Sequence, residues 1–245
     1  MTTTLVIDIG GSDLKATVLD DAGAMLTERV SRPTRYPCAP VGLVAQLAEL
    51  AAALPSFDRI SVGFPGVVRQ GLIVTAPHFV SAQGPGGVRD PALETAWRNF
   101  DLAGGLESEL GRAARIINDA DLQGVGLHRG RGVEVIMTLG TGVGTCVFED
   151  SRLGPHLELA HHPLHGDQTY NQYLGESARA RIGNEEWNAR VRHAIVALDR
   201  LFVFDHLYVG GGNTRHIVGA LPSHVTIVDP NAALLAGVKL WDAPR

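Results

Sequence analysis

The chain has 245 residues, of which 45% are hydrophobic and 19% charged, a composition typical of a folded globular protein rather than a disordered one. The formal net charge is −5 and no run of Lys or Arg stands out, which argues against nucleic acid as a main partner. The only two cysteines, Cys38 and Cys146, indicate neither a disulfide framework nor a structural zinc site. No apolar run reaches the roughly 18 residues that cross a membrane. We also see no secretion signal, so we expect a cytoplasmic protein without a membrane partner.

The N-terminal stretch at residues 8–15 (DIGGSDLK) is the most informative part of the sequence. Residues 5–7 predict a buried strand and residues 14–19 a second one, joined by a turn with two glycines. Such glycines let backbone N–H groups approach a ligand closely. Asp8, at the strand end, can hold a hydrated Mg²⁺, and Lys15 can meet a phosphate. An ordinary hairpin with a polar turn is the alternative for this stretch alone, but two glycine-rich turns downstream favour a ligand site.

The first half of the sequence predicts a mixed α/β unit. Short strands are expected at 25–30, 59–62, 72–75 and 115–117, and helices at 41–54 and 102–110. Residues 76–97 are rich in Gly and Pro, so we expect a long irregular segment there. The strand at 115–117 ends in Asn118-Asp119-Ala120-Asp121, where we place the boundary between two halves. Asp121 is the expected cap of a helix that runs to about residue 128.

The second half repeats the layout of the opening hairpin. Strands at 133–138 and 143–148 flank a second glycine-rich turn, Gly140-Thr141-Gly142. A third turn, Gly210-Gly211-Gly212, follows a strand at 206–209, and a helix that starts there would offer its N–H groups to an anion. A last strand is expected at 225–228 and helices at 170–182, 185–202 and 231–241. Two such hairpins in two halves indicate a duplicated architecture with a ligand between them.

Six motifs in sequence order resemble those of one enzyme family. Three glycine-rich motifs are similar to the phosphate and adenosine elements of actin-like, ribonuclease-H-like sugar kinases: Asp8-Ile9-Gly10-Gly11-Ser12, Leu139-Gly140-Thr141-Gly142-Val143-Gly144 and Val209-Gly210-Gly211-Gly212. Three more narrow the resemblance to the ROK family (repressors, open reading frames, kinases): Gly63-Phe64-Pro65-Gly66, Asn118-Asp119-Ala120-Asp121 and Glu158-Leu159-Ala160-His161. The resemblance covers nearly the whole sequence and is greatest to the polyphosphate glucokinase branch.

The resemblance implies an α/β protein with the two-domain actin-like (ribonuclease H-like) ATPase fold and a central cleft. Residues 1–118 would form a smaller N-terminal α/β domain, joined by the C-terminal helix at about 230–245. Residues 119–229 would form a larger C-terminal α/β domain. The resemblance also implies a homodimer whose partners are a small-molecule sugar and a phosphoryl donor, with no nucleic acid.

The implied activity is transfer of a phosphoryl group from polyphosphate, ATP or both to the 6-hydroxyl of glucose. Asp119 would be the general base, because the acid of this Asn-Asp pair accepts the proton of the attacked hydroxyl in the family. Its alternative role is that of a helix cap. The implied sugar-binding residues are Gly66, Asn118, Asp119, Glu158, His161 and Asn171.

The donor would be bound by the glycine-rich turns, for which plain tight turns are the alternative. The implied phosphate- and nucleotide-binding residues are Asp8, Gly10, Gly11, Ser12, Lys15, Gly140, Thr141, Gly142, Gly210, Gly211 and Gly212. Mg²⁺ is the expected cofactor, held by Asp8 through water. Zinc is not expected, because the three cysteines that follow the histidine in most family kinases are absent after His161. A metal site of histidines is the alternative, with His156, His161, His162 and His165 as its candidates. A polyphosphate path would be lined with cations, for which Arg89, Arg98, Arg129 and Arg131 are candidates.

The sugar side departs from the family pattern at several positions. Ala160 stands where Gly is usual, His78 where Asn is usual, and Asn171 where Glu is usual. A kinase for another hexose, such as mannose, fructose or an N-acetylated hexosamine, therefore stays open. A non-catalytic sugar sensor also stays open, although the family's repressors carry an N-terminal helix-turn-helix and this sequence begins with the first phosphate strand.

Overall fold

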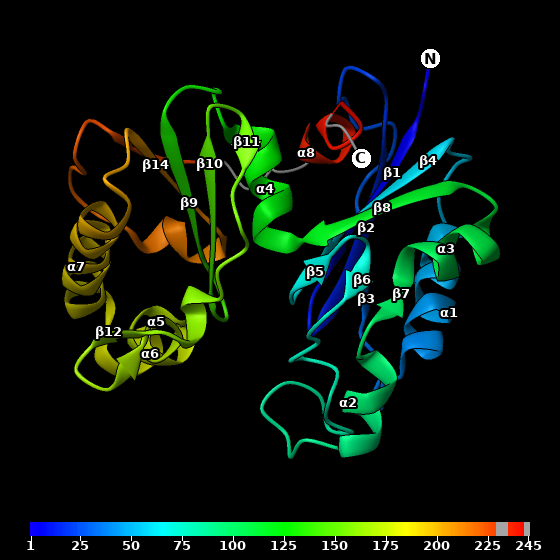
Figure 1. Cartoon of the computed structure of the whole chain (residues 1–245), viewed down its shortest axis with the longest axis horizontal. Helices are drawn as coiled ribbons and strands as arrows, with labels where there is room; N and C mark the ends of the chain where they lie inside the picture. The colour runs from blue at the N-terminus through cyan, green and yellow to red at the C-terminus, as the bar shows by residue number, and fades with distance from the viewer. Residues whose placement is uncertain (229–234, 243–245) are drawn as a thin grey trace. The chain divides into compact units, whose positions relative to one another are not determined.

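The computed structural model describes residues 1–228 and 235–242, coloured along the sequence in Figure 1. The chain forms two compact units. The first combines residues 1–122 with 234–245, and the second contains residues 123–233. The N-terminal part of the first unit ends at residue 122, whereas the sequence placed the boundary after residue 118. The first unit has the larger number of residues, whereas the C-terminal domain was expected to be the larger.

A five-stranded sheet organises the first unit, in the order β3-β2-β1-β4-β8. Its strands are β1 (Thr4–Ile9), β2 (Asp13–Leu19), β3 (Val30–Pro33), β4 (Arg59–Phe64) and β8 (Ala113–Asn118). β1 and β2 form an antiparallel hairpin, whereas β1, β4 and β8 run parallel. Because parallel strands end at the same edge of a sheet, the residues that follow β1, β4 and β8 are neighbours.

One face of this sheet packs against α1 (Pro40–Ala51) and α3 (Leu102–Leu110). Side chains alternate along a strand, so Leu5, Ile7 and Ile9 of β1 share this face and lie in the core with both helices. These three side chains are at most 1% exposed. The apolar period of two in the opening strand therefore builds the core that holds the first glycine-rich turn in place.

The C-terminal segment packs on the first unit at Val6, a residue of β1 that alternates with those core side chains. α8 (Leu235–Lys239) places Val238 against Val6 and Leu19. The Ser61 hydroxyl donates to the Gly237 carbonyl at 2.6 Å. Of the helix predicted at 231–241, residues 231–234 lie outside the described residues.

Two sequence expectations for the first unit are wrong. The third strand is not at 25–30, where Met25 forms only an isolated bridge with Leu19, but at Val30–Pro33. The segment 76–97 is not irregular throughout, because it ends in α2 (Pro91–Trp97), which Asp90 caps by accepting from Ala92 N. The strands on either side of this segment in the sequence form a small three-stranded sheet. They are β5 (Val68–Arg69), β6 (Leu72–Ile73) and β7 (Phe100–Asp101).

The second unit contains another five-stranded sheet, in the order β11-β10-β9-β14-β15. Its strands are β9 (Val133–Leu139), β10 (Val143–Glu149), β11 (Arg152–Leu153), β14 (His206–Gly210) and β15 (Val225–Ile227). β9 and β10 form an antiparallel hairpin, and β9, β14 and β15 run parallel. The two sheets thus have the same plan of a hairpin followed by parallel strands, as the duplicated sequence pattern predicted.

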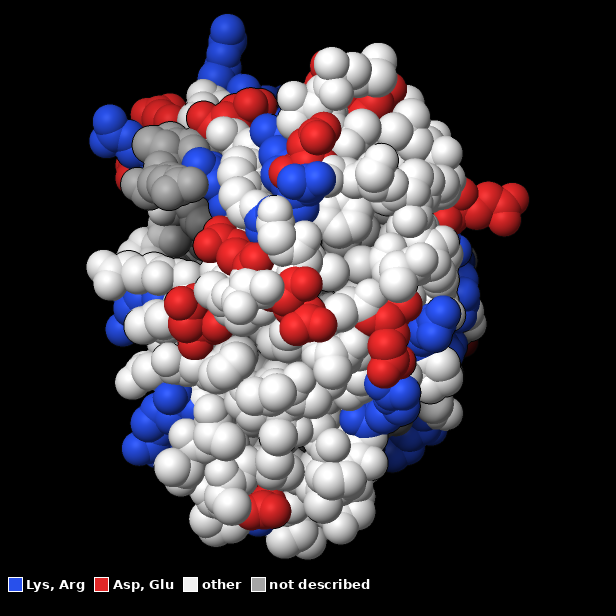
Figure 2. All heavy atoms as spheres, turned by 90° about the vertical axis from the view of Figure 1, so that its right-hand side faces the viewer, with Lys and Arg blue, Asp and Glu red and all other residues white. Residues whose placement is uncertain are grey.

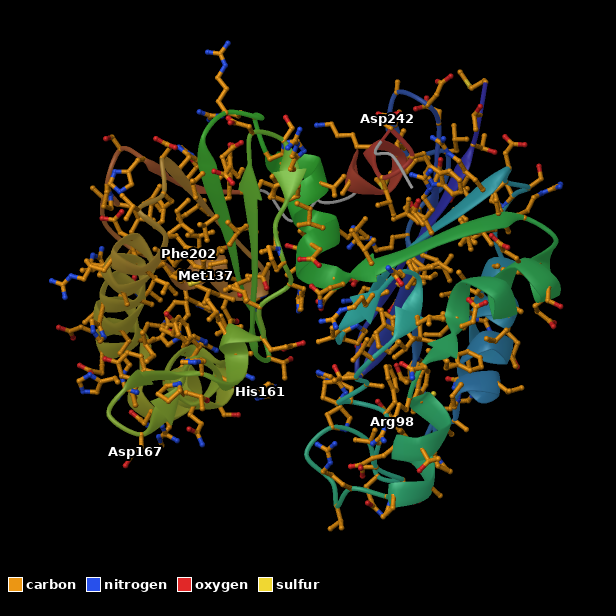
Figure 3. All side chains as sticks on the ribbon, viewed as in Figure 1. Arg98, Met137, His161, Asp167, Phe202 and Asp242 are labelled. Atoms are coloured by element: carbon orange, nitrogen blue, oxygen red, sulfur yellow. The ribbon has the colours of Figure 1, made fainter. Side chains whose placement is uncertain are left out.

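Helices and a small hairpin complete the second unit. They are α5 (Tyr170–Leu174), α6 (Glu176–Ile182), α7 (Asn184–Phe202), β12 (Pro163–His165), β13 (Gln168–Thr169) and the 3₁₀ helices η1 (Leu159–His161) and η2 (Gly212–His216). Trp187, Val191 and Ile195 of α7 share a core with Met137 of β9, which Figure 3 labels. α4 (Asp119–Leu127) begins in the first unit and ends in the second.

Two helix predictions for the second unit are wrong. The helix predicted at 170–182 is interrupted at Gly175, which separates α5 from α6. The helix predicted after Gly212 is a 3₁₀ helix of five residues.

Across residues 1–228 and 235–242, no helix combines the length and apolarity needed to cross a membrane. Figure 2 shows acidic and basic side chains interspersed on one face.

Candidate active site

The carboxyl edge of the first sheet brings two predicted acids into one region. Asp8 of β1 lies opposite Gly63 of β4, and Gly63 lies opposite Ile117 of β8. Asp119 follows Ile117 by two residues. Neighbouring strands are about 4.8 Å apart, so β1 and β8 are separated by two strand spacings, roughly 10 Å, at the level of Asp8. The first glycine-rich turn and the candidate base therefore share one edge of one unit.

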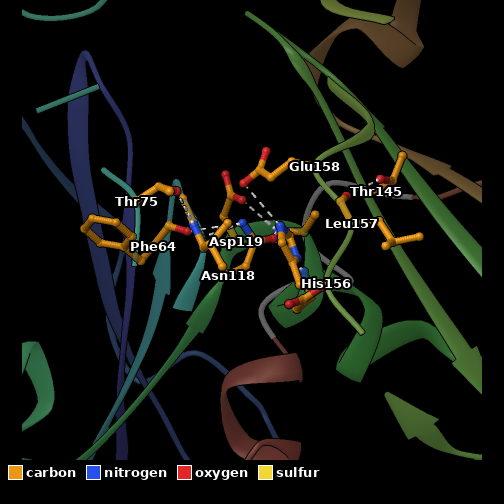
Figure 4. A network of polar contacts seen from close by, with 12 residues as sticks. Phe64, Thr75, Asn118, Asp119, Thr145, His156, Leu157 and Glu158 are labelled. Atoms are coloured by element: carbon orange, nitrogen blue, oxygen red, sulfur yellow. Dashed lines mark hydrogen bonds and ion pairs between the residues drawn. The ribbon is translucent and has the colours of Figure 1, made fainter. Parts of the chain in front are cut away.

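Asn118 fixes the start of α4, as Figure 4 shows. Its side chain is buried, and Oδ1 accepts hydrogen bonds from the N–H groups of Ala120 at 2.8 Å and Asp121 at 3.1 Å. Its Nδ2 donates to the carbonyls of Gly66 at 3.1 Å and Phe64 at 3.5 Å. Asn118 is therefore the helix cap, and the prediction that Asp121 caps this helix is wrong. The role of Asn118 as a sugar ligand stays a prediction.

Asp119 is the first residue of α4 and is half-buried. Its Oδ1 accepts from Ala120 N at 2.9 Å. The partial positive charge at a helix N-terminus favours a carboxylate there. Gly63 permits the close approach of β4, because a Cβ at that position would lie 3.3 Å from the Asp119 Cα. The sheet edge and the Asn118 cap together set where this carboxylate leaves the backbone.

The first glycine-rich turn connects β1 and β2 and carries Gly10, Gly11 and Ser12. Asp8 and Lys15 face each other across this hairpin. The side chain of Asp8 is exposed, but protein atoms crowd it, and this desolvation raises its pKa against the lowering effect of Lys15 and Arg29. An exposed carboxylate beside a glycine-rich turn fits Mg²⁺, which is usually held by one or two carboxylates and substrate phosphates.

The second glycine-rich turn, in the second unit, is held by side chains and by the start of α6. Asn171 Oδ1 accepts from Val143 N at 2.6 Å. The Gly140 carbonyl accepts from Glu176 N at 3.0 Å and from Asn213 Nδ2 at 3.1 Å. Asn171 was predicted as a sugar ligand, and the structure places its carbonyl oxygen on this turn. Its binding to sugar stays a prediction.

The third turn lies against the end of β9. Gly211 has φ +91°, and a Cβ there would lie 2.3 Å from the Leu139 carbonyl oxygen. Gly175 is a residue that sequence reasoning missed, since a Cβ there would lie 2.8 Å from the Thr141 carbonyl oxygen. The signal for Gly175 was a glycine inside a helical pattern. The second unit thus gathers Gly140–Gly142, Gly210–Gly212 and Asn171 into one region.

The predicted sugar loop of the second unit lies at η1. Glu158 precedes this 3₁₀ helix and His161 is its last residue, and both are exposed. His156 Nε2 lies 3.3 Å from Glu158 Oε1, and Figure 4 shows this contact. From the sequence, His156 was considered only as a possible metal ligand, and its contact with Glu158 was missed. This contact helps to set the direction of the Glu158 carboxylate.

Within residues 1–228 and 235–242, no group of three or more His, Cys, Asp or Glu is arranged to hold a metal ion. Of the arginines considered for a polyphosphate path, Arg89 pairs with Glu94, and the guanidinium of Arg129 lies 5.9 Å from the centre of the Tyr208 ring. Both are therefore already engaged within their own unit.

Comparison with solved structures defines the class of fold. The chain superposes on the inorganic polyphosphate/ATP-glucomannokinase of Arthrobacter sp. strain KM with a TM-score of 0.81 and 24% identity, over 99% of this chain and 100% of that one. Both share the α/β, actin-like two-domain ATPase fold.

Sequence comparison then defines the family. The model of the ROK family matches residues 4–167, and the chain belongs to this family. The chain is 28% identical to a polyphosphate glucokinase of Mycobacterium leprae over 221 residues, which cover 85% of this chain but 63% of that protein. It is also 30% identical to an N-acetylmannosamine kinase of Citrobacter koseri over 156 residues, 61% of this chain and 49% of that protein.

Proposed function

We propose that the protein is a hexose kinase that transfers a phosphoryl group from polyphosphate, ATP or both to the 6-hydroxyl of glucose. The observation that carries this proposal is the shared sheet edge. Asp8 lies near the end of β1, just before the first glycine-rich turn, and Asp119 directly follows β8. Similarity to a polyphosphate glucokinase and to a polyphosphate/ATP-glucomannokinase supports the choice of reaction and donor.

The proposed mechanism assigns proton transfer to Asp119. Its carboxylate accepts the proton of the sugar 6-hydroxyl while that oxygen forms a bond to the terminal phosphorus of the donor. The bond between this phosphorus and its bridging oxygen breaks, leaving ADP or a polyphosphate shortened by one unit. Asp8 would hold Mg²⁺ through water, and this ion, when bound, would neutralise donor charge.

The remaining predicted residues support binding rather than proton transfer. In the first unit, backbone N–H groups of Gly10–Ser12 and the Lys15 ammonium would face donor phosphates, and Gly66 and Asn118 would shape the sugar site. In the second unit, we propose that Gly140–Gly142 and Gly210–Gly212 bind the donor. Glu158, His161 and Asn171 would contact the sugar.

The direct test is a coupled assay of glucose phosphorylation with ATP and with polyphosphate, run side by side with and without Mg²⁺. The proposal expects turnover with at least one donor and its loss without the metal. Absence of turnover on every hexose tested, with either donor, would contradict it. Glucose binding by calorimetry without any phosphoryl transfer would instead support the sensor alternative.

A second candidate is a kinase for another hexose. The similarity to an N-acetylmannosamine kinase favours it, as does Asn171, whose carbonyl oxygen is occupied by Val143 N–H. Because lost hydroxyl partners change specificity, mannose, fructose and N-acetylated hexosamines belong in the same assay. A kcat/KM for one of these at least tenfold above that for glucose would establish the alternative.

The assembly and location of the protein are also proposals. We propose a homodimer, which light scattering coupled to size exclusion would test through its molar mass. The cytoplasmic location predicted from the sequence stays a prediction.

A further inference from the structure

The carbonyl groups of the first glycine-rich turn are held by a single short segment, residues 34–36. The Thr34 hydroxyl donates to the Gly10 carbonyl at 2.9 Å, and Thr34 N donates to the Ser12 carbonyl at 2.8 Å. Between them, the Tyr36 hydroxyl donates to the Gly11 carbonyl at 2.7 Å. Three successive carbonyls are therefore bonded toward the same side of the turn.

This arrangement fixes where the N–H groups of the turn point. In a trans peptide, the C=O of one residue and the N–H of the next point in opposite directions. The N–H groups of Gly11 and Ser12 therefore face away from residues 34–36. Successive N–H groups that point the same way form a cradle for an anion such as a phosphate.

The Gly- and Pro-rich segment 76–90 lies against the same turn. A Cβ on Gly11 would come within 2.3 Å of His78 Nδ1 and 2.6 Å of Pro85 Cγ, so both rings touch this glycine. A Cβ on Gly84 would lie 2.9 Å from Tyr36 Cε2. The segment therefore contacts the turn directly, and also through the ring of Tyr36.

The Tyr36 ring is held independently of its hydroxyl. It stacks on Phe79 with ring centres 6.2 Å apart. Burial raises the pKa of Tyr36 to about 12, with a smaller contribution from Cys38. Its hydroxyl therefore remains a proton donor at any pH at which the enzyme would work.

We propose that Tyr36 is a positioning residue for the phosphoryl donor, and that residues 76–90 support the donor turn through it. This inference rests on the proposed function, because it takes the turn to be a phosphate site. By this inference, residues 76–90 act on the donor side of the reaction. From the sequence, His78 in this segment was expected to lie on the sugar side.

The first experiment is Tyr36→Phe, which removes the hydroxyl and keeps the ring. Loss of one hydrogen bond to the turn is expected to raise the KM for ATP and polyphosphate about three- to tenfold. The KM for glucose should stay within twofold of the parent. The affinity for inorganic tripolyphosphate, measured by calorimetry, should fall by the same factor as the donor KM rises.

The second experiment compares Gly84→Ala with Gly86→Ala. Both glycines have positive φ, +87° and +80°, so both substitutions carry a similar backbone strain. Only the Gly84 variant places a methyl against the Tyr36 ring, because nothing lies within 4 Å of a Cβ on Gly86. Gly84→Ala should reproduce the donor-specific rise in KM, and Gly86→Ala should not.

Three outcomes would overturn the inference: an unchanged donor KM and tripolyphosphate affinity in Tyr36→Phe, an equal rise in donor and glucose KM, or no tripolyphosphate binding by the parent. If the parent transfers no phosphoryl group but binds tripolyphosphate in a Tyr36-dependent way, the proposed function fails and the inference stands. If Gly84→Ala does not fold, Tyr36→Phe decides the question alone.

Discussion

The two glycine-rich hairpin turns are built on the same strand plan but are held in different ways. In the first unit, residues 34–36 bind the carbonyls of Gly10, Gly11 and Ser12. In the second unit, Asn171 accepts from an N–H group next to the turn, that of Val143. In the first turn, the N–H groups of Gly11 and Ser12 therefore point away from residues 34–36. Beside the second turn, the N–H group of Val143 is already bound by Asn171.

The strands that lead into these turns differ as well. Alignment of the turns at Gly10 and Gly140 places Asp8 of β1 level with Thr138 of β9. Asp8 is an exposed carboxylate, whereas the Thr138 hydroxyl accepts from Gly144 N at 3.0 Å. The same alignment places the buried Thr4 level with the buried Glu134. The two copies of the plan thus differ in where they carry a carboxylate: an exposed one near the turn in the first unit and a buried one at the far end of the strand in the second.

The largest difference is expected between Gly11→Ala and Gly140→Ala. A methyl on Gly11 overlaps His78 and Pro85, whereas nothing lies within 4 Å of a Cβ on Gly140. Overpacking of this kind costs about 1–3 kcal/mol, so donor kcat/KM should fall by about ten- to a hundredfold in Gly11→Ala. Gly140→Ala should lose less than Gly11→Ala. Steady-state kinetics with varied donor would check this, and equal losses would contradict the comparison.

The buried carboxylate of the second unit should make its stability depend on pH. Burial raises the pKa of Glu134, but hydrogen bonds from Arg129 N, the Tyr208 hydroxyl and Gly130 N together lower it below its ordinary value. The unfolded state therefore binds more protons, so this contribution to stability is complete above an ordinary pKa of about 4.5 and is lost as pH falls through the folded pKa.

Glu134→Gln tests that contribution. At pH 7 it should lower the free energy of unfolding by about 1.5–3 kcal/mol, because hydrogen bonds to a charged acceptor are weakened. On going from pH 7 to 4, the variant should lose less stability than the parent. Urea unfolding at several pH values is the measurement, and parallel pH profiles for the two proteins would contradict the prediction.

A smaller effect is expected at Asn171. Asn171→Ala removes the acceptor of the Val143 N–H and should lower the free energy of unfolding by about 1 kcal/mol. The matched variant Asn171→Asp keeps an acceptor, so its stability should stay near that of the parent. Its added negative charge beside the donor turn should raise the donor KM. If Asn171→Asp lowers the free energy of unfolding as much as Asn171→Ala does, the hydrogen bond to Val143 N–H is not how Asn171 stabilises the protein.

The main strands of the fold could be predicted because their signals are local. β1, β4 and β9 are largely apolar runs with a glycine within two residues after the strand, and these are strong strand and turn signals. The strand expected at 25–30 failed because pairing with β2, a tertiary effect, occurs later at Val30–Pro33. α2 was missed although Asp90-Pro91 is a helix-start signal, because the Gly-rich composition of 76–90 outweighed it.

The site was predictable in part for the same reason. Asp8 lies near the end of β1 and Asp119 directly follows β8, and the ends of both strands could be read from the sequence. The positions of Tyr36 and Asn171 could not be, because their partners Gly11 and Val143 are 25 and 28 residues away. The cap at Asn118 also depends on a distant carbonyl, that of Gly66, and not on the local pattern that pointed to Asp121.

The most direct test of the account is Asp119→Asn, a change that keeps the shape of the side chain and an oxygen for Ala120 N–H. The account predicts that kcat for glucose phosphorylation falls by about 10²- to 10⁴-fold with either donor, because the proton acceptor is lost. Glucose affinity, measured by calorimetry, should change only a few-fold. A variant that retains kcat within tenfold of the parent would contradict the claim that this carboxylate is the base.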